Sequence, residues 1–70
     1  MEIITYDQYK KMFKKNADGS YYDLKIIDDI TGSMFDFSGK KPEEYTIDEI
    51  IVLKKYAEKI SKMVDVNSIN

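Results

Sequence analysis

The 70-residue chain contains neither His nor Cys, and this absence limits the chemistry open to it. Imidazole is the commonest general base in enzymes, and the thiol is the commonest strongly nucleophilic side chain. The same two groups are the usual ligands of structural zinc. Ser61 and Lys62 are neighbours, but adjacent residues of a helix diverge and do not form a nucleophile with its base. We therefore expect a protein that is not an enzyme and that binds no metal and no cofactor.

Carboxylates occur in adjacent pairs, at Asp28-Asp29, Glu43-Glu44 and Asp48-Glu49. A catalytic pair of carboxylates must converge on one substrate atom, whereas consecutive residues of a strand point to opposite faces. Asp and Glu are also rarely buried. We interpret these pairs as solvated surface.

Lysines gather in one short segment, at Lys10, Lys11, Lys14 and Lys15. A nucleic-acid interface usually belongs to a basic domain that also uses Arg. This chain has no Arg and a net charge of −2. We therefore interpret these lysines as the solvated face of the first helix. Weak nucleic-acid binding through them is kept as an alternative, although nucleic acid is not the expected partner.

Two capping boxes mark the starts of two helices. Thr5 precedes Gln8 by three residues and Thr46 precedes Glu49 by three, the spacing at which side chains cap the first turn. Apolar residues recur behind both at helical spacing. These signals predict helices over residues 5–17 and 46–64.

Alternating apolar and polar residues predict two strands between the helices, over residues 21–30 and 34–38. The number of residues in the connecting turn decides which side chains share a face, because a one-residue slip inverts them all. We expect an even turn of two or four residues, which places Phe35 and Phe37 on the face of Leu24 and Ile26.

These elements predict one small α+β domain with the order αββα, or βαββα if Glu2 to Ile4 adds a strand. Both helices are expected on one face of the antiparallel hairpin. The expected core holds the apolar residues of that face and of the helices: Tyr9, Phe13, Tyr22, Leu24, Ile26, Phe35, Phe37, Ile50, Leu53, Ala57 and Ile60.

The opposite face of the hairpin is the candidate partner-binding surface. Apolar and acidic residues alternate there, and two further acids follow the second strand; the set is Tyr21, Asp23, Ile27, Asp29, Met34, Asp36, Glu43 and Glu44. An open sheet face with apolar residues inside an acidic rim is typical of a binding surface.

The leading hypothesis is a small protein-binding or inhibitor domain that acts on a host protein through this acidic sheet face. Abundant Lys, Ile and Tyr indicate an A+T-rich genome and favour a phage or mobile element as the source. The alternative is a homodimeric structural domain, with Tyr21, Ile27 and Met34 at the dimer contact. Residues 1–4 lack the basic and apolar regions of a signal peptide, so we expect a cytoplasmic protein. No apolar run is long enough to span a membrane.

Overall fold

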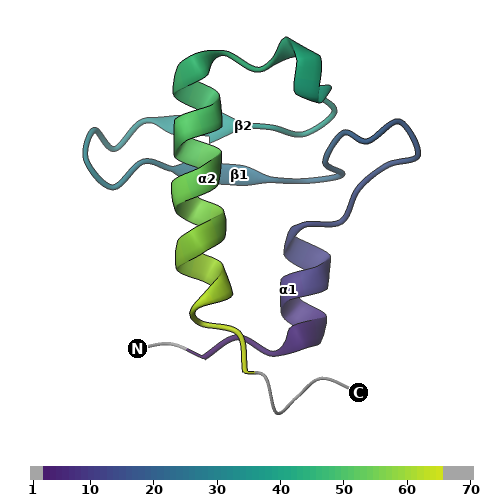
Figure 1. Ribbon diagram of the computed structural model, residues 1–70, viewed down its shortest axis with the longest axis vertical. Helices are drawn as coiled ribbons and strands as arrows, with labels where there is room; N and C mark the ends of the chain where they lie inside the picture. The colour runs from purple at the N-terminus through teal and green to yellow at the C-terminus, as the bar shows by residue number, and fades with distance from the viewer. Residues whose placement is uncertain (1–2, 66–70) are drawn as a thin grey trace.

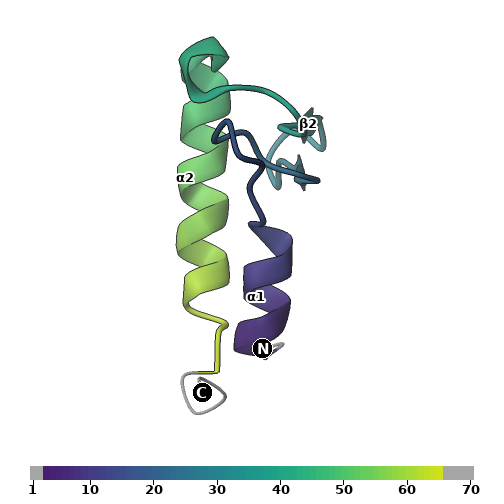
Figure 2. The ribbon, with the colours of Figure 1, turned by 90° about the vertical axis from the view of Figure 1, so that its right-hand side faces the viewer.

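The computed structural model describes residues 3–65 and has the expected α+β class. Its elements are α1 (Tyr6–Met12), β1 (Lys25–Ile27), β2 (Met34–Asp36), the 3₁₀ helix η1 (Pro42–Glu44) and α2 (Ile47–Ser61). The two strands form an antiparallel sheet, and α2 lies across one face of it (Figures 1 and 2). The η1 turn was not expected from the sequence.

Both capping boxes are confirmed. The Gln8 amide donates to Thr5 Oγ1 at 3.2 Å, and the Thr5 amide donates to Gln8 Oε1 at 2.9 Å. At α2 the Glu49 amide donates to Thr46 Oγ1 at 3.2 Å, and the Thr46 amide donates to Glu49 Oε1 at 2.8 Å. Each box satisfies amides that the first turn of a helix leaves without an intrahelical acceptor.

The first helix ends at Met12, well before the predicted residue 17. The reason is a tight excursion of the chain over residues 14–22. The Tyr22 amide donates to the Lys14 carbonyl at 2.8 Å, and the Asn16 amide donates to the Ser20 carbonyl at 2.8 Å. Asp18 accepts from the amide and hydroxyl of Ser20, which is buried. Local side-chain acceptors thus compete successfully with continued helix.

Each strand is three residues long, shorter than the predicted 21–30 and 34–38. Ser38 limits the ladder at one end, because its hydroxyl accepts from the Leu24 amide at 3.0 Å. At the other end Asp28 folds the turn, accepting from the Thr31 hydroxyl at 2.8 Å. Residues 28–33 therefore form a six-residue loop instead of the two or four expected.

The loop is longer than predicted but still even, and the residues of the regular ladder therefore lie on the predicted faces. Ile26 pairs with Phe35, and Ile27 pairs with Met34. Leu24, Ile26 and Phe37 are buried, and Phe35 packs against them.

Two residues expected in the core are exposed. Tyr22 precedes the regular strand, and its ring lies under the Lys14 ammonium, 4.6 Å from Nζ to centroid. Ile50 is exposed because α2 presents Val52, Leu53 and Tyr56 to the hairpin instead.

The first helix, α1, runs antiparallel to the C-terminal half of α2 (Figure 1). It lies on the same side of α2 as the hairpin, next to β1 (Figure 2). It reaches the core through Phe13, whose ring centroid lies 6.0 Å from that of Tyr56. The molecule is therefore two layers thick, with α2 as one layer and the hairpin with α1 as the other.

Ile4 pairs with Val64, after α2, and not with the hairpin. The sheet thus keeps two strands among the described residues, and Glu2 of the expected extra strand lies outside them.

Candidate functional site

The hairpin face opposite α2 carries two apolar side chains directly across from each other. Ile27 is 66% exposed and its strand partner Met34 is 63% exposed. Their alternation with Ile26 and Phe35 sends them away from the core. Figure 2 shows α2 on the other side of the strands, so no helix of the described chain covers this pair.

A charged rim adjoins the apolar pair. Lys25 faces Asp36 two pairs further along the ladder, which is the next pair on the same face. Asp36 Oδ1 accepts from the Ser38 amide at 2.9 Å, and the Ser38 hydroxyl donates to Asp23 Oδ1 at 3.5 Å. The hydrogen bonds from Ser38, assisted by the positive charge of Lys25, lower the pKa of the Asp36 carboxyl. Asp36 therefore stays charged at neutral pH, and Asp23 lies beside it, linked through Ser38.

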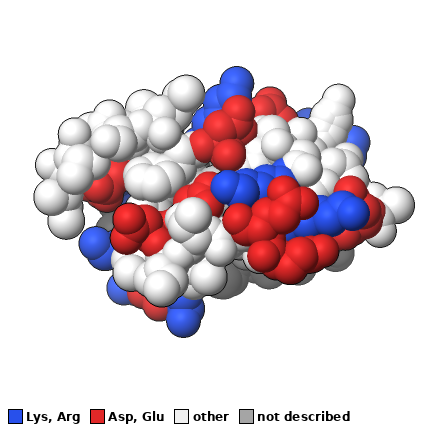
Figure 3. All heavy atoms as spheres, turned by 90° about the horizontal axis from the view of Figure 1, so that it is seen from above, with Lys and Arg blue, Asp and Glu red and all other residues white. Residues whose placement is uncertain are grey.

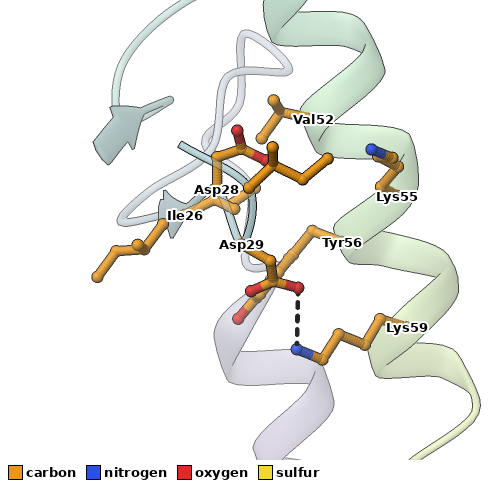
Figure 4. Close-up of a pocket in the computed structure, with 9 residues that line it drawn as sticks. Ile26, Asp28, Asp29, Val52, Lys55, Tyr56 and Lys59 are labelled. Carbon is orange, nitrogen blue, oxygen red and sulfur yellow. Dashed lines mark ion pairs between the residues drawn. The ribbon is translucent and has the colours of Figure 1, made fainter. Parts of the chain in front are cut away.

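Tyr21 and Asp29 do not lie on this face, contrary to the prediction. Tyr21 turns inward, with its ring centroid 6.1 Å from that of Phe13, and burial raises the pKa of its hydroxyl. Asp29 turns toward α2, where its carboxylate lies 3.6 Å from Lys59 Nζ (Figure 4). The strand alternation that placed both residues holds only within residues 25–27, and each lies beyond that range.

Glu43 and Glu44 lie in η1, at the end of the molecule where α2 begins. Figure 3 shows acidic side chains gathered over that end but interleaved with lysines. Near the start of α2, Lys40 donates to both carboxylate oxygens of Glu49 at 2.8 Å, which lowers the Glu49 pKa. The predicted acids are thus divided among the outer hairpin face, the loop after β1 and η1, and they do not form one negative surface.

A groove of about 380 Å³ runs between the hairpin loop and α2. Figure 4 shows Asp28 and Asp29 on the loop side and Lys55 and Lys59 on the α2 side. Hydrogen bonds from Thr31 lower the pKa of Asp28. The groove is open, and within residues 3–65 no three acidic side chains are arranged to hold a metal ion.

The lysine cluster of the first helix is spread out in the structure. Lys10 lies over the Tyr6 ring at 5.3 Å, and Lys15 lies over the Tyr21 ring at 5.2 Å. Lys10 and Lys11 belong to α1, whereas Lys14 and Lys15 follow its end. The four ammonium groups therefore do not share one helical face.

Sequence reasoning missed a second exposed apolar group, on α2. Ile47, Ile50 and Ile51 are all exposed, at the helical spacing i, i+3 and i+4. The signal was present in the sequence: Ile50, Ile51, Val52 and Leu53 are consecutive, and four consecutive helical residues cannot all face one side.

Comparisons of the chain with known protein families, with curated proteins and with solved structures found no match. No helix within residues 3–65 has the length and apolar character needed to cross a membrane.

Proposed function

We propose that this chain is a non-catalytic protein-binding domain that contacts its partner through the outer hairpin face, centred on Ile27 and Met34. The observation that carries the proposal is the exposure of these two paired side chains on a sheet face without a covering helix. Exposed apolar groups within a polar rim are typical of protein interaction sites.

The charges of the rim indicate which charges a matching partner surface carries. Asp23 and Asp36 lie at one end of the apolar pair, so a matching partner carries a shallow apolar contact flanked by Lys or Arg. Such complementary charges act mainly on the association rate and on specificity. Of the predicted set, Ile27, Met34, Asp23 and Asp36 remain the proposed contact residues, while Tyr21 and Asp29 are removed from it.

The proposed biological role is inhibition of a host protein by a phage or mobile-element product in the cytoplasm. Two features support it: a composition typical of an A+T-rich genome, and the absence of His and Cys, which argues against catalysis. A small domain inhibits most directly by occupying a surface that its target needs.

The test is capture by a tagged chain from the lysate of a low-G+C bacterium, at low and high salt, with mass spectrometry of the bound proteins. We expect one host protein at stoichiometric yield. Met34→Glu places a charge in the centre of the contact and should weaken capture roughly tenfold or more. Asp36→Lys should weaken it chiefly at low salt, where rim charges act over the longest range.

Ile3→Glu is the matched control, because Ile3 is 70% exposed and its neighbour Ile4 pairs with Val64 beyond the C-terminal end of α2, the end away from the hairpin (Figure 1). It should capture as the unmodified chain does. If Met34→Glu captures the partner as well as the unmodified chain does, the contact does not lie on the hairpin face. If no host protein is captured at stoichiometric yield, the proposal is wrong.

A further inference from the structure

The outer face of α2 carries an apolar stripe that nothing in the described chain covers. Ile47 is 77% exposed, Ile51 49% and Ile50 42%. The core-facing side of the same helix is formed by Val52, Leu53, Tyr56 and Ile60. The N-terminal half of α2 is therefore apolar on both sides.

A surface helix normally carries polar side chains on the face away from the core, so an apolar outer stripe is unusual. The hairpin reaches only one edge of this stripe. Ile51 lines a shallow pocket with Ile30 of the hairpin loop and Phe35 of β2, whereas Ile47 and Ile50 do not line that pocket. Within residues 3–65, moreover, the buried apolar residues are limited to Leu24, Ile26, Phe37 and Ile60. So small a core usually requires additional stabilisation, and self-association is one source of it.

The charges beside the stripe identify a second copy as the occupant. Asp48 and Lys55 lie seven residues apart, on the same side of α2 as Ile51, which stands between them. If two α2 helices pack antiparallel about a two-fold axis near Ile51, Asp48 of each copy faces Lys55 of the other. Antiparallel packing also sets the macrodipole of each helix against the opposite end of its neighbour.

Both charges are free to make this contact. Among the described residues, Lys40 pairs with Glu49 and Lys59 with Asp29, while neither Asp48 nor Lys55 is in an ion pair. Lys55 lines the loop groove with Asp28 and only influences its carboxyl through space.

We infer that the chain forms a two-fold symmetric homodimer in which the Ile47, Ile50 and Ile51 stripes of two α2 helices pack antiparallel. Such an interface is self-complementary, with Ile51 of the two copies meeting at the two-fold axis and each acid meeting a lysine. The two hairpins lie on the outside of the dimer. The inference does not depend on the proposed function, because Ile27 and Met34, the centre of the proposed partner contact, take no part in it.

Cysteine crosslinking tests the contact directly, since the native chain has no Cys. Ile51→Cys places a thiol next to the two-fold axis, and Met34→Cys places a thiol at a more exposed position on the hairpin face. Under mild oxidation of the purified variants, Ile51→Cys should give a disulfide-linked dimer much faster than Met34→Cys. The unmodified chain should show twice its 8.2 kDa mass by light scattering.

Charge reversal tests the predicted partners. Lys55→Glu should raise the dimer dissociation constant roughly tenfold or more, because it opposes like charges across the contact twice. Adding Asp48→Lys to that variant should restore the dimer, which a merely unfolded variant could not do. Circular dichroism of each variant checks that α2 remains intact.

A chain that stays monomeric at every concentration measured would overturn the inference. Faster crosslinking through Met34→Cys would also overturn it and would place the self-contact on the hairpin face. Failure of the double variant to recover would exclude the antiparallel register about Ile51.

Discussion

Tyr45 keeps its hydroxyl in the interior without a hydrogen-bond partner among residues 3–65. Its ring packs edge-on against Phe37 with centroids 5.4 Å apart, so the aromatic part of the side chain contributes to the core. Burial raises the pKa of the Tyr45 hydroxyl, and the nearby Tyr21 and Glu49 add to the shift. The hydroxyl is therefore desolvated without compensation.

We predict that Tyr45→Phe increases the free energy of unfolding by about 1 kcal/mol, because it removes an unsatisfied buried group and keeps the ring. Urea unfolding followed by circular dichroism measures the change. Tyr22→Phe is the control, since the exposed Tyr22 hydroxyl should contribute little. A loss of stability in Tyr45→Phe would mean that the hydroxyl has a partner after all.

At the scale of the elements, the N-terminal cap of α2 combines a capping box with an ion pair. Thr46 holds the first turn, and Glu49 completes the box while also binding Lys40. We predict that Thr46→Ala lowers the free energy of unfolding by about 1 kcal/mol, whereas Thr46→Ser, which keeps the hydroxyl, has a much smaller effect. Thermal unfolding of the two variants side by side makes the comparison, and equal stability would show that the cap is dispensable.

The starts of the helices and the faces of the strands could be predicted from the sequence because both depend on local rules. Thr5 and Thr46 stand at fixed spacing from their partners, and strand alternation placed Ile26 and Phe35 together. The ends of the elements could not be predicted in this way. The short strands depend on Ser38, which reaches the Leu24 amide from fourteen residues away.

Part of the candidate surface could also be predicted, because strand alternation is a local rule. Ile27, Met34 and Asp36 belong to the regular ladder, so their outward direction follows from their position in the sequence. Tyr21 and Asp29 lie outside it, and Asp29 turns toward a lysine of α2 that no local pattern could indicate. The two-sided apolar character of α2 was visible in the sequence, but the side that meets the hairpin was not.

For the molecule as a whole, four carboxyl groups link folding to pH. The pKa values of Asp18, Asp28, Asp36 and Glu49 all lie below their ordinary values of 3.8 for Asp and 4.5 for Glu. The principal cause is hydrogen bonding to the charged form: from Ser20 to Asp18, from Thr31 to Asp28, from Ser38 to Asp36, and from Lys40 to Glu49.

Each of these carboxyl groups has a lower pKa in the folded state than in the unfolded state. The stability that the charged groups contribute is therefore fully present at a pH above their unfolded-state pKa values, and it is lost as the pH falls through their folded-state pKa values. We predict a free energy of unfolding that is nearly constant at neutral pH and declines below about pH 4.5. Urea unfolding across this pH range measures the decline. Asp18→Asn, which cannot be charged, should make the free energy of unfolding depend less on pH. An unchanged dependence would show that Asp18 does not contribute to it.

Backbone hydrogen bonds join the two ends of the described chain. The Ile4 amide donates to the Met63 carbonyl at 2.9 Å, and the Asp65 amide donates to the Ile4 carbonyl at 2.8 Å. The chain thus returns to its starting point, at the end of the molecule opposite η1 (Figure 1). Adjacent ends of this kind suit a domain to insertion within a carrier protein or to circular permutation. A carrier loop joined at Ile4 and Asp65 would need to open by only about 5 Å, the spacing of two paired strands, to accept the described part of the fold.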